Sequence, residues 1–236
     1  MSEKKRILLK LTGEAFLSTT DNSLNPSLVI DLVRQIKQLM NCYQFGLVIG
    51  GGNFFRGKQH GKVMNITPPV GHQIGMLATL MNGLMMKDLL EQHGVIASLF
   101  SAITCPEMAS SISQQAIENA LLKDQVIIFA GGTGNPFFST DTTAVLRSLQ
   151  INAEEIWKAS HIDGVYTADP KINPEAKILK NITYQYALDH KLGIMDATAF
   201  TLAAENKQVI RVFSAFEPNA LIKATQNKDF GSIIHV

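Results

Sequence analysis

Short apolar segments alternate with segments of helical periodicity along the whole chain, and this alternation restricts the fold more than any other feature. The expected strands are 6–11, 46–49, 95–100, 125–130, 155–158, 209–213 and 232–235. The expected helices are 26–40, 71–93, 114–122, 142–149, 184–190, 197–205 and 219–226. Such alternation predicts a mostly parallel sheet with helices on both faces. We therefore expect an α/β fold, a three-layer αβα sandwich. The length of 236 residues suits one such domain, or two lobes that share one sheet.

Composition and charge exclude several classes of protein. Hydrophobic residues make up 46% of the chain and charged residues 17%, so a large core can form. The formal net charge is +1 and no basic run dominates, so we expect no nucleic-acid partner. No segment reaches the ~20 apolar residues of a membrane span. The apolar run after the basic N-terminus is too short for a secretory signal, which predicts a cytoplasmic protein without membrane association.

Glycine-rich and polar motifs follow the expected strands, where ligands bind in open parallel sheets. The first motif is Lys10-Leu11-Thr12-Gly13, at the end of the first strand. An ammonium group there suits a phosphate, and a glycine lets the backbone approach a ligand closely. The alternative is an ordinary strand-end lysine in solvent.

The second motif, residues 50–57, reads Gly-Gly-Gly-Asn-Phe-Phe-Arg-Gly after the second strand. Exposed N–H groups in such a turn form an anion-binding nest, and Arg56 adds a planar fork that can grip a phosphate. The alternative is a tight turn with a surface arginine. Residues 52–58 match P-loop spacing, but Gln59 lacks the hydroxyl that would hold Mg²⁺. We also expect no helix to begin at residues 67–69, so a P-loop is rejected.

The third motif, residues 131–141, follows a buried strand and combines glycines, hydroxyls, an amide, two aromatic rings and a carboxylate. Its hydroxyl and N–H groups can bind a phosphate, and Phe137 and Phe138 can form the wall of a pocket for a base. Asp141 can cap the following helix, or it can orient a lysine or a hydrated Mg²⁺. The alternative for the whole motif is a long polar loop.

The fourth motif begins at Lys158, which brings a second ammonium group to the end of a strand. Ser160 follows it. Tyr166 can stack on a nucleobase, and Asp169 can accept hydrogen bonds from a ribose or a base. The alternative is a turn-rich loop with Asx and proline signals.

Together these motifs resemble the amino-acid kinase superfamily and, within it, the bacterial uridylate kinases. The resemblance runs from Lys5 to about Ile234, and its strongest stretches are 5–15, 48–57, 75–83, 133–141, 163–170 and 195–200. It implies reversible transfer of the γ-phosphoryl group of ATP to UMP, giving UDP and ADP for pyrimidine nucleotide (CTP and UTP) synthesis. It also implies a homohexamer, and Mg²⁺ held mainly by the ATP phosphates rather than by direct protein ligands.

The resemblance also implies a single domain of residues 1–236, whose N-terminal part binds the acceptor and whose C-terminal part binds ATP. The catalytic residues that it implies are Lys10, Lys158 and Asp141. The ATP contacts that it implies are Lys10, Leu11, Thr12, Gly13, Gly52, Arg56, Ser160, Tyr166 and Asp169. The UMP contacts that it implies are Gly51, Thr133, Gly134, Asn135, Pro136, Phe137, Phe138, Ser139 and Thr140.

The chain departs from the family pattern at two places. The family usually has an aspartate that contacts the UMP ribose where this chain has His72, so we do not transfer that contact. Residues 16–25 contain no glycine, whereas many members have a glycine-containing insert there that is tied to GTP activation. Two alternatives stay open, an acetylglutamate-, aspartate- or carbamate-type kinase and a nucleotide-binding regulator without catalysis.

Overall fold

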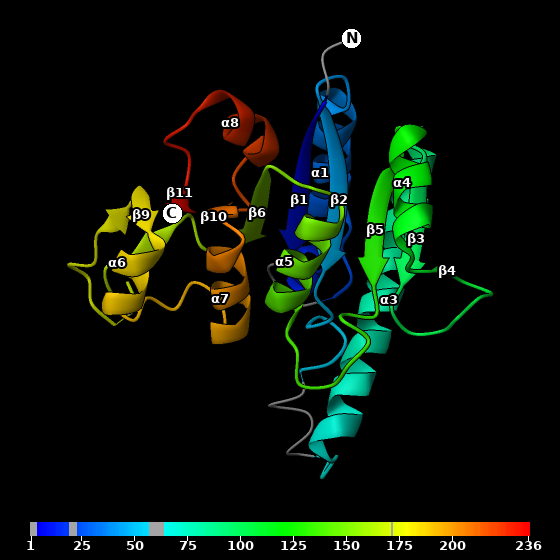
Figure 1. Ribbon diagram of the computed structural model, residues 1–236, viewed down its shortest axis with the longest axis horizontal. Coiled ribbons are helices and arrows are strands. Elements are labelled where there is room, and N and C mark those ends of the chain that lie inside the picture. Colours follow the sequence, from blue (N-terminus) through cyan, green and yellow to red (C-terminus); the bar gives the residue numbers. More distant parts are fainter. Residues whose placement is uncertain (1–3, 19–22, 57–63, 171) are drawn as a thin grey trace.

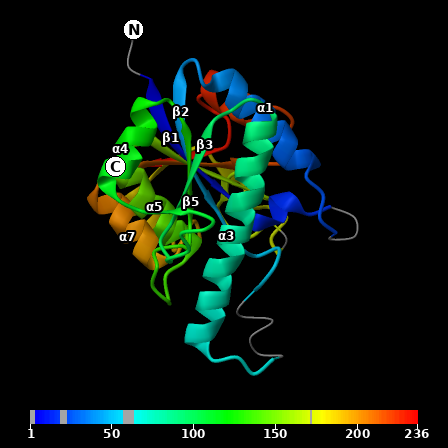
Figure 2. The same cartoon turned by 90° about the vertical axis from the view of Figure 1, so that its right-hand side faces the viewer.

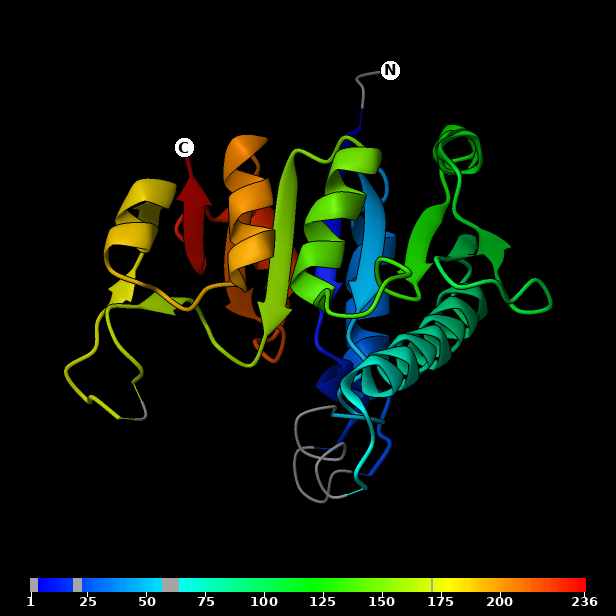
Figure 3. The ribbon, with the colours of Figure 1, turned by 60° about the horizontal axis from the view of Figure 1, so that its bottom comes forward.

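The computed structural model describes residues 4–18, 23–56, 64–170 and 172–236 (Figure 1). Within these residues a nine-stranded sheet has the order β4-β3-β5-β2-β1-β6-β10-β11-β9. Its strands are β1 (Lys5–Leu11), β2 (Tyr43–Ile49), β3 (Ala97–Ser101), β4 (Ser110–Ser111), β5 (Val126–Ala130), β6 (Glu155–Ser160), β9 (Asn181–Thr183), β10 (Val209–Ser214) and β11 (Ser232–His235). All neighbours pair in parallel except β10 and β11, and Figure 3 shows β11 pointing against β6.

Helices cover both faces of the sheet, which confirms the three-layer α/β sandwich (Figure 2). One face carries α1 (Ser27–Leu39), α3 (Pro68–Gln92) and α8 (Ala220–Gln226). The other carries α4 (Gln114–Leu122), α5 (Thr140–Gln150), α6 (Tyr184–Asp189) and α7 (Ala197–Glu205). In the part of the chain described here, no helix combines the length and apolar character needed to cross a membrane.

The alternation of side chains along β1 and β6 decides where the two strand-end lysines point. Leu9 and Leu11 pack toward α1 and α3, whereas Leu8 packs toward α5. Since successive side chains of a strand face opposite sides, Lys10 lies on the α5 side with Leu8. Lys158 lies on that side too, and the parallel register of β1 and β6 pairs it with Lys10.

The structure corrects one expectation about local structure and adds short elements that were not expected. Helix α3 begins at Pro68 with Thr67 as its N-cap, so residues 67–69 do start a helix. Proline is tolerated there because the first helical N–H groups have no intrahelical partner. Gln59 lies outside the described residues. The sequence patterns also did not predict several short elements. These are the 3₁₀ helix η1 (Gly13–Phe16), strands β4 and β9, and the hairpin of β7 (Val165–Tyr166) and β8 (Ile178–Leu179).

Candidate active site

Lys10 and Lys158 meet at the carboxylate of Asp141, which lies in the first turn of α5. Lys10 Nζ is 3.1 Å from Asp141 Oδ1, and Lys158 Nζ is 2.6 Å from Oδ2. Lys158 Nζ also donates to the carbonyl oxygen of Ile194 at 2.5 Å. The three side chains are 13%, 12% and 16% exposed, for Lys10, Lys158 and Asp141. The residue that caps α5 is Ser139, so Asp141 is free of that role and binds the two ammonium groups instead.

Lys10, Lys158 and Asp141 together carry one excess positive charge, and the nearby Asp196 carboxylate partly offsets it at Lys158. Burial alone would raise the pKa of Asp141, but the Lys10 and Lys158 ammonium groups outweigh burial and hold that pKa below its ordinary value of 3.8. Burial lowers the pKa of Lys158, and Lys10 lowers it further, while Asp141 opposes both effects. An ionised carboxylate between two cations fixes their positions without neutralising both, so the cluster can attract an anion.

The turns after β1 and β2 touch each other directly beside this cluster. A Cβ atom on Gly13 would lie 2.4 Å from the carbonyl oxygen of Gly50 and 2.4 Å from Asn53 Oδ1. A side chain at position 13 would therefore separate the two turns. Glycine is required here for the close approach of two backbone segments.

Asn82, a residue that the sequence interpretation overlooked, holds the glycine turn after β2. Its side chain is fully buried on α3, where Nδ2 donates to the Gly50 carbonyl oxygen at 2.6 Å and to Asn53 Oδ1 at 2.8 Å. Asn53 Nδ2 donates back to Asn82 Oδ1 at 2.9 Å. The available signal was a polar residue within the apolar 78–86 stretch of the expected helix.

Replacing Asn82 by alanine is expected to lower the free energy of unfolding by about 2–3 kcal/mol, because buried polar groups of the turn lose their partner. Urea denaturation of the variant and the wild type measures this difference. Asn119→Ala is the matched control, since Asn119 is an exposed asparagine on α4. A loss for Asn82→Ala no larger than that of the control would contradict a structural role for this hydrogen-bond network.

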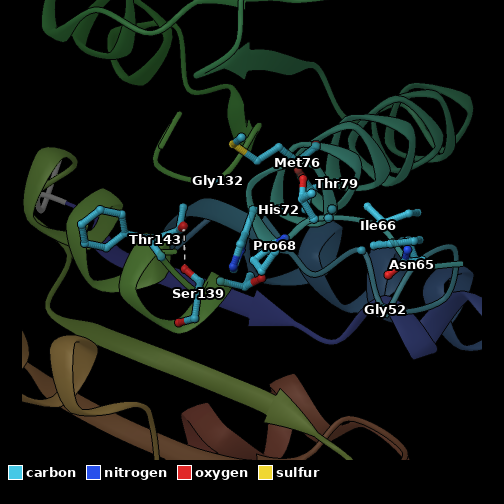
Figure 4. Close-up of a pocket in the computed structure, with 17 residues that line it drawn as sticks. Gly52, Asn65, Ile66, Pro68, His72, Met76, Thr79, Gly132, Ser139 and Thr143 are labelled. Atoms are coloured by element: carbon cyan, nitrogen blue, oxygen red, sulfur yellow. Dashed lines mark hydrogen bonds between the residues drawn. The ribbon is translucent and has the colours of Figure 1, made fainter. Parts of the chain in front are cut away.

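A cavity of about 800 Å³ lies beyond the carboxyl ends of β2 and β5 (Figure 4). The N-terminal half of α3, the turn after β2, the loop after β5 and the start of α5 form its walls. Its lining residues are Gly51, Gly52, Phe55, Asn65, Ile66, Thr67, Pro68, Gly71, His72, Gly75, Met76, Thr79, Gly132, Phe138, Ser139, Thr140 and Thr143. A volume of this size is in the usual range for a small-molecule ligand.

The acceptor residues expected from the sequence are only partly gathered at this cavity. Those that line it are Gly51, Phe138, Ser139 and Thr140. Those outside its lining are Thr133, Gly134, Asn135, Pro136 and Phe137. Of the two aromatic rings, Phe138 alone is part of the wall.

Phe137 lies at the rim instead, where the residue is 70% exposed and its φ is +71°. Its ring centroid is 5.0 Å from that of His72, which lines the cavity. His72 therefore lines the cavity and also contacts Phe137 at its rim.

The ATP residues expected from the sequence lie at the ends of β1, β2 and β6 and in the loop beyond β6. Leu11 is fully buried in the core, and its carbonyl oxygen accepts from Gly50 N–H at 3.0 Å. Thr12 caps η1 by accepting from Glu14 N–H at 3.4 Å. Arg56 Nε donates to the carbonyl oxygen of Gly52 at 3.2 Å.

The remaining expected ATP residues follow Lys158 in the chain. Ser160 is the last residue of β6, and its Oγ accepts from Ile162 N–H at 3.5 Å. Tyr166, in the β7–β8 hairpin, donates through its hydroxyl group to Asp163 Oδ1 at 2.7 Å, a bond that raises the pKa of Tyr166. The Asp169 carbonyl oxygen accepts from N–H groups further along the same loop.

Two polar residues without an assigned role support the start of α5 and the loop after β5. Asp196 caps α7 and accepts hydrogen bonds from the hydroxyl groups of Ser139 and Thr142. Thr79 Oγ1 accepts from Gly131 N–H at 2.9 Å. Asp196 stands before an expected helix, a typical capping position, but its partners on α5 come from a distant part of the sequence.

The described residues contain no group of three or more His, Cys, Asp and Glu side chains placed to hold a metal ion. The carboxylate of Asp141 already carries two lysines.

Comparison with known proteins gives consistent matches over nearly the whole chain. Residues 5–214 match the amino acid kinase family. The uridylate kinase of Mycoplasma pneumoniae is 42% identical over 221 residues, which are 93% of this chain and 94% of that protein. The uridylate kinase of Haemophilus influenzae (strain PittGG) is 42% identical over 231 residues, or 98% of this chain and 97% of that protein.

Solved structures agree with these matches. The crystal structure of UMP kinase from Ureaplasma parvum superposes with a TM-score of 0.94 at 35% identity, covering 99% of this chain and 100% of that one. The crystal structure of UMP kinase from Bacillus anthracis gives a TM-score of 0.92 at 29% identity, covering 98% of this chain and 96% of that one.

Proposed function

The chain belongs to the amino acid kinase family, and from this membership and its site we infer that it is a UMP kinase. It transfers the γ-phosphoryl group of ATP to UMP and gives UDP and ADP, in a reversible reaction. Uridylate kinases at 42% identity over nearly the full chain support the choice of acceptor. The observation that carries the mechanism is the pair of ammonium groups that Asp141 holds at two neighbouring strand ends.

The chemistry of phosphoryl transfer suits such a cluster. The phosphate oxygen of a nucleoside monophosphate is already a nucleophile at neutral pH, so no covalent phospho-enzyme is needed. Charge spreads over the oxygens of the transferring group, and fixed cations stabilise it there. Lys10 and Lys158 are the proposed catalytic cations, and Asp141 keeps both in position.

We place the acceptor in the cavity and the donor at the ends of β1, β2 and β6. Gly51, Ser139 and Thr140 line the cavity and can donate to an acceptor phosphate, while Phe138 can contact its base. The proposal keeps the other acceptor contacts as well: Thr133, Gly134, Asn135, Pro136 and Phe137. The proposed ATP contacts are Lys10, Leu11, Thr12, Gly13, Gly52, Arg56, Ser160, Tyr166 and Asp169. Mg²⁺, bound through the ATP phosphates, supplies further charge neutralisation.

Four further features belong to this proposal. The N-terminal part of the one domain binds the acceptor and the C-terminal part binds ATP, while the N-terminal ATP contacts, Lys10 to Gly13, Gly52 and Arg56, reach the bound ATP from the ends of β1 and β2. The protein is a homohexamer. It works in the cytoplasm, and its product enters pyrimidine nucleotide synthesis.

A coupled assay of ADP release tests the function and its alternatives. Wild-type protein with MgATP is offered UMP, CMP, dUMP, glutamate and aspartate in separate reactions. We expect release to be fastest with UMP and absent with the two amino acids. Release with glutamate or aspartate would favour a carboxylate kinase, and no release with any acceptor would favour a regulator without catalysis.

The rate should fall in alkali earlier than the titration of an ordinary lysine would predict. Burial and Lys10 lower the pKa of Lys158 below 10.5, so its ammonium group is lost as the pH rises through that lowered value. A neutral amine cannot stabilise the transferring phosphoryl group. We expect kcat, measured with saturating substrates between about pH 7 and 10.5, to decline with a midpoint below the ordinary lysine value of about 10.4. In Lys158→Arg, whatever activity is left should lack this decline, and a wild-type kcat that stays constant through this range would contradict the assignment.

A further inference from the structure

The carboxylate of Glu14 lies between two side chains that can donate hydrogen bonds, those of Arg56 and His161. One oxygen contacts Arg56 Nη2, and the other contacts His161 Nε2. Glu14 belongs to η1 directly after β1, Arg56 follows the glycine turn after β2, and His161 follows β6. One carboxylate thus connects the ends of three adjacent parallel strands.

The His161 ring is fixed from its other side. It stacks on Phe216, which follows β10, with ring centroids 4.3 Å apart and an angle of 18° between the planes. Arg56 is anchored through its Nε to the Gly52 carbonyl oxygen. The two donors are therefore held on either side of the Glu14 carboxylate, which acts as the anion between them.

These groups can be reached by a ligand from solvent. The side chains of Arg56 and His161 are 44% and 52% exposed, and that of Glu14 is 25% exposed. None of the three lines the 800 Å³ cavity, which lies on the β2 and β5 side of the sheet. An anion bound by Arg56 and His161 would lie toward β6, so it belongs to the donor polyphosphate rather than to the acceptor.

We propose that His161 joins Arg56, already a proposed ATP contact, in binding the phosphate chain of the donor nucleotide, and that Glu14 occupies this site until the nucleotide displaces it. The inference rests on the proposed kinase function. An arginine fork binds a phosphate in the same bidentate manner as a carboxylate, and an imidazole can donate to either. Glu14 competes with the polyphosphate for both donors and repels it as a like charge, so the residue weakens donor binding.

The test is Glu14→Gln, which keeps the shape of the side chain and removes its charge. We expect the KM for ATP and the Kd for inorganic tripolyphosphate to fall about three- to tenfold, the size of a single like-charge contact at a partly exposed site. Glu154→Gln is the matched control. It removes one carboxylate that pairs with Lys5 at 3.4 Å, at the amino ends of β1 and β6, and it should change neither constant.

A second variant tests whether His161 contributes to anion binding. In the Glu14→Gln background, His161→Gln should reverse much of the gain in tripolyphosphate affinity, while thermal melting shows that both variants are folded. An unchanged or higher KM and Kd in Glu14→Gln would overturn the proposal. Wild-type ADP release with UMP separates the two claims. If it is absent while tripolyphosphate binds the variant more tightly, the kinase assignment fails and the anion site stands.

Discussion

Replacing Lys10 or Lys158 by alanine is expected to lower kcat by a factor on the order of 10² or more, with a smaller change in KM. Each lysine side chain is only about one-eighth exposed and contacts Asp141 through its ammonium group, so neither is an ordinary lysine in solvent. A cation that acts on the transferring phosphoryl group contributes more in the transition state than in the ground state. Steady-state kinetics with UMP and ATP varied separately measure both constants.

Lys5→Ala is the matched control for this experiment. Lys5 lies on the same strand as Lys10 but at its other end, where its side chain is 62% exposed and pairs with Glu154. Its removal should leave kcat within about twofold of the wild type, since an exposed ion pair contributes little. A Lys10→Ala variant with the kcat of the wild type would refute the catalytic assignment of Lys10.

Replacing Asp141 by alanine is expected to destabilise the protein by about 3 kcal/mol at neutral pH, because two partly buried ammonium groups then lack their counter-ion. The pKa of Asp141 in the folded protein is below its ordinary value of 3.8. Its contribution is therefore fully present above that value and is lost as the pH falls through the lowered pKa. Urea denaturation at pH 7 and at successively lower pH measures the difference from the wild type.

A double variant separates the loss of charge pairing from a simple packing defect. In Asp141→Ala/Lys158→Met one uncompensated ammonium group is removed, so we expect part of the lost stability to return. A packing defect would give the double variant at least the loss of Asp141→Ala alone. An Asp141→Ala protein as stable as the wild type would show that the ion pairs of this cluster do not stabilise the fold.

The layers of the fold and the meeting of the two lysines could be predicted from local patterns. Strand periodicity places Lys10 and Lys158 at strand ends, and parallel pairing brings such ends to one edge of the sheet. The confirmed family and fold follow from motifs that each lie within about ten residues. The catalytic and binding roles of the individual residues stay predictions.

The residues that support the site could not be predicted from local sequence patterns, because their partners are far away in the chain. Glu14 meets His161, Asn82 meets Gly50, and Asp196 meets Ser139 only after the sheet has formed. The start of α3 was missed because two consecutive prolines indicate a turn as readily as a first helical turn. The rim position of Phe137 depends on its positive φ, which could not be predicted from the neighbouring residues.

The proposed mechanism requires that the ammonium groups of Lys10 and Lys158 both contact the phosphoryl group that is transferred. A crystal structure with UMP, Mg²⁺ and a non-hydrolysable ATP analogue is the direct test of these contacts. We predict that the Nζ atoms of Lys10 and Lys158 both lie within hydrogen-bond distance of the γ-phosphate. We also predict that UMP occupies the cavity between α3 and the start of α5. A γ-phosphate bound away from both ammonium groups would contradict the proposed mechanism.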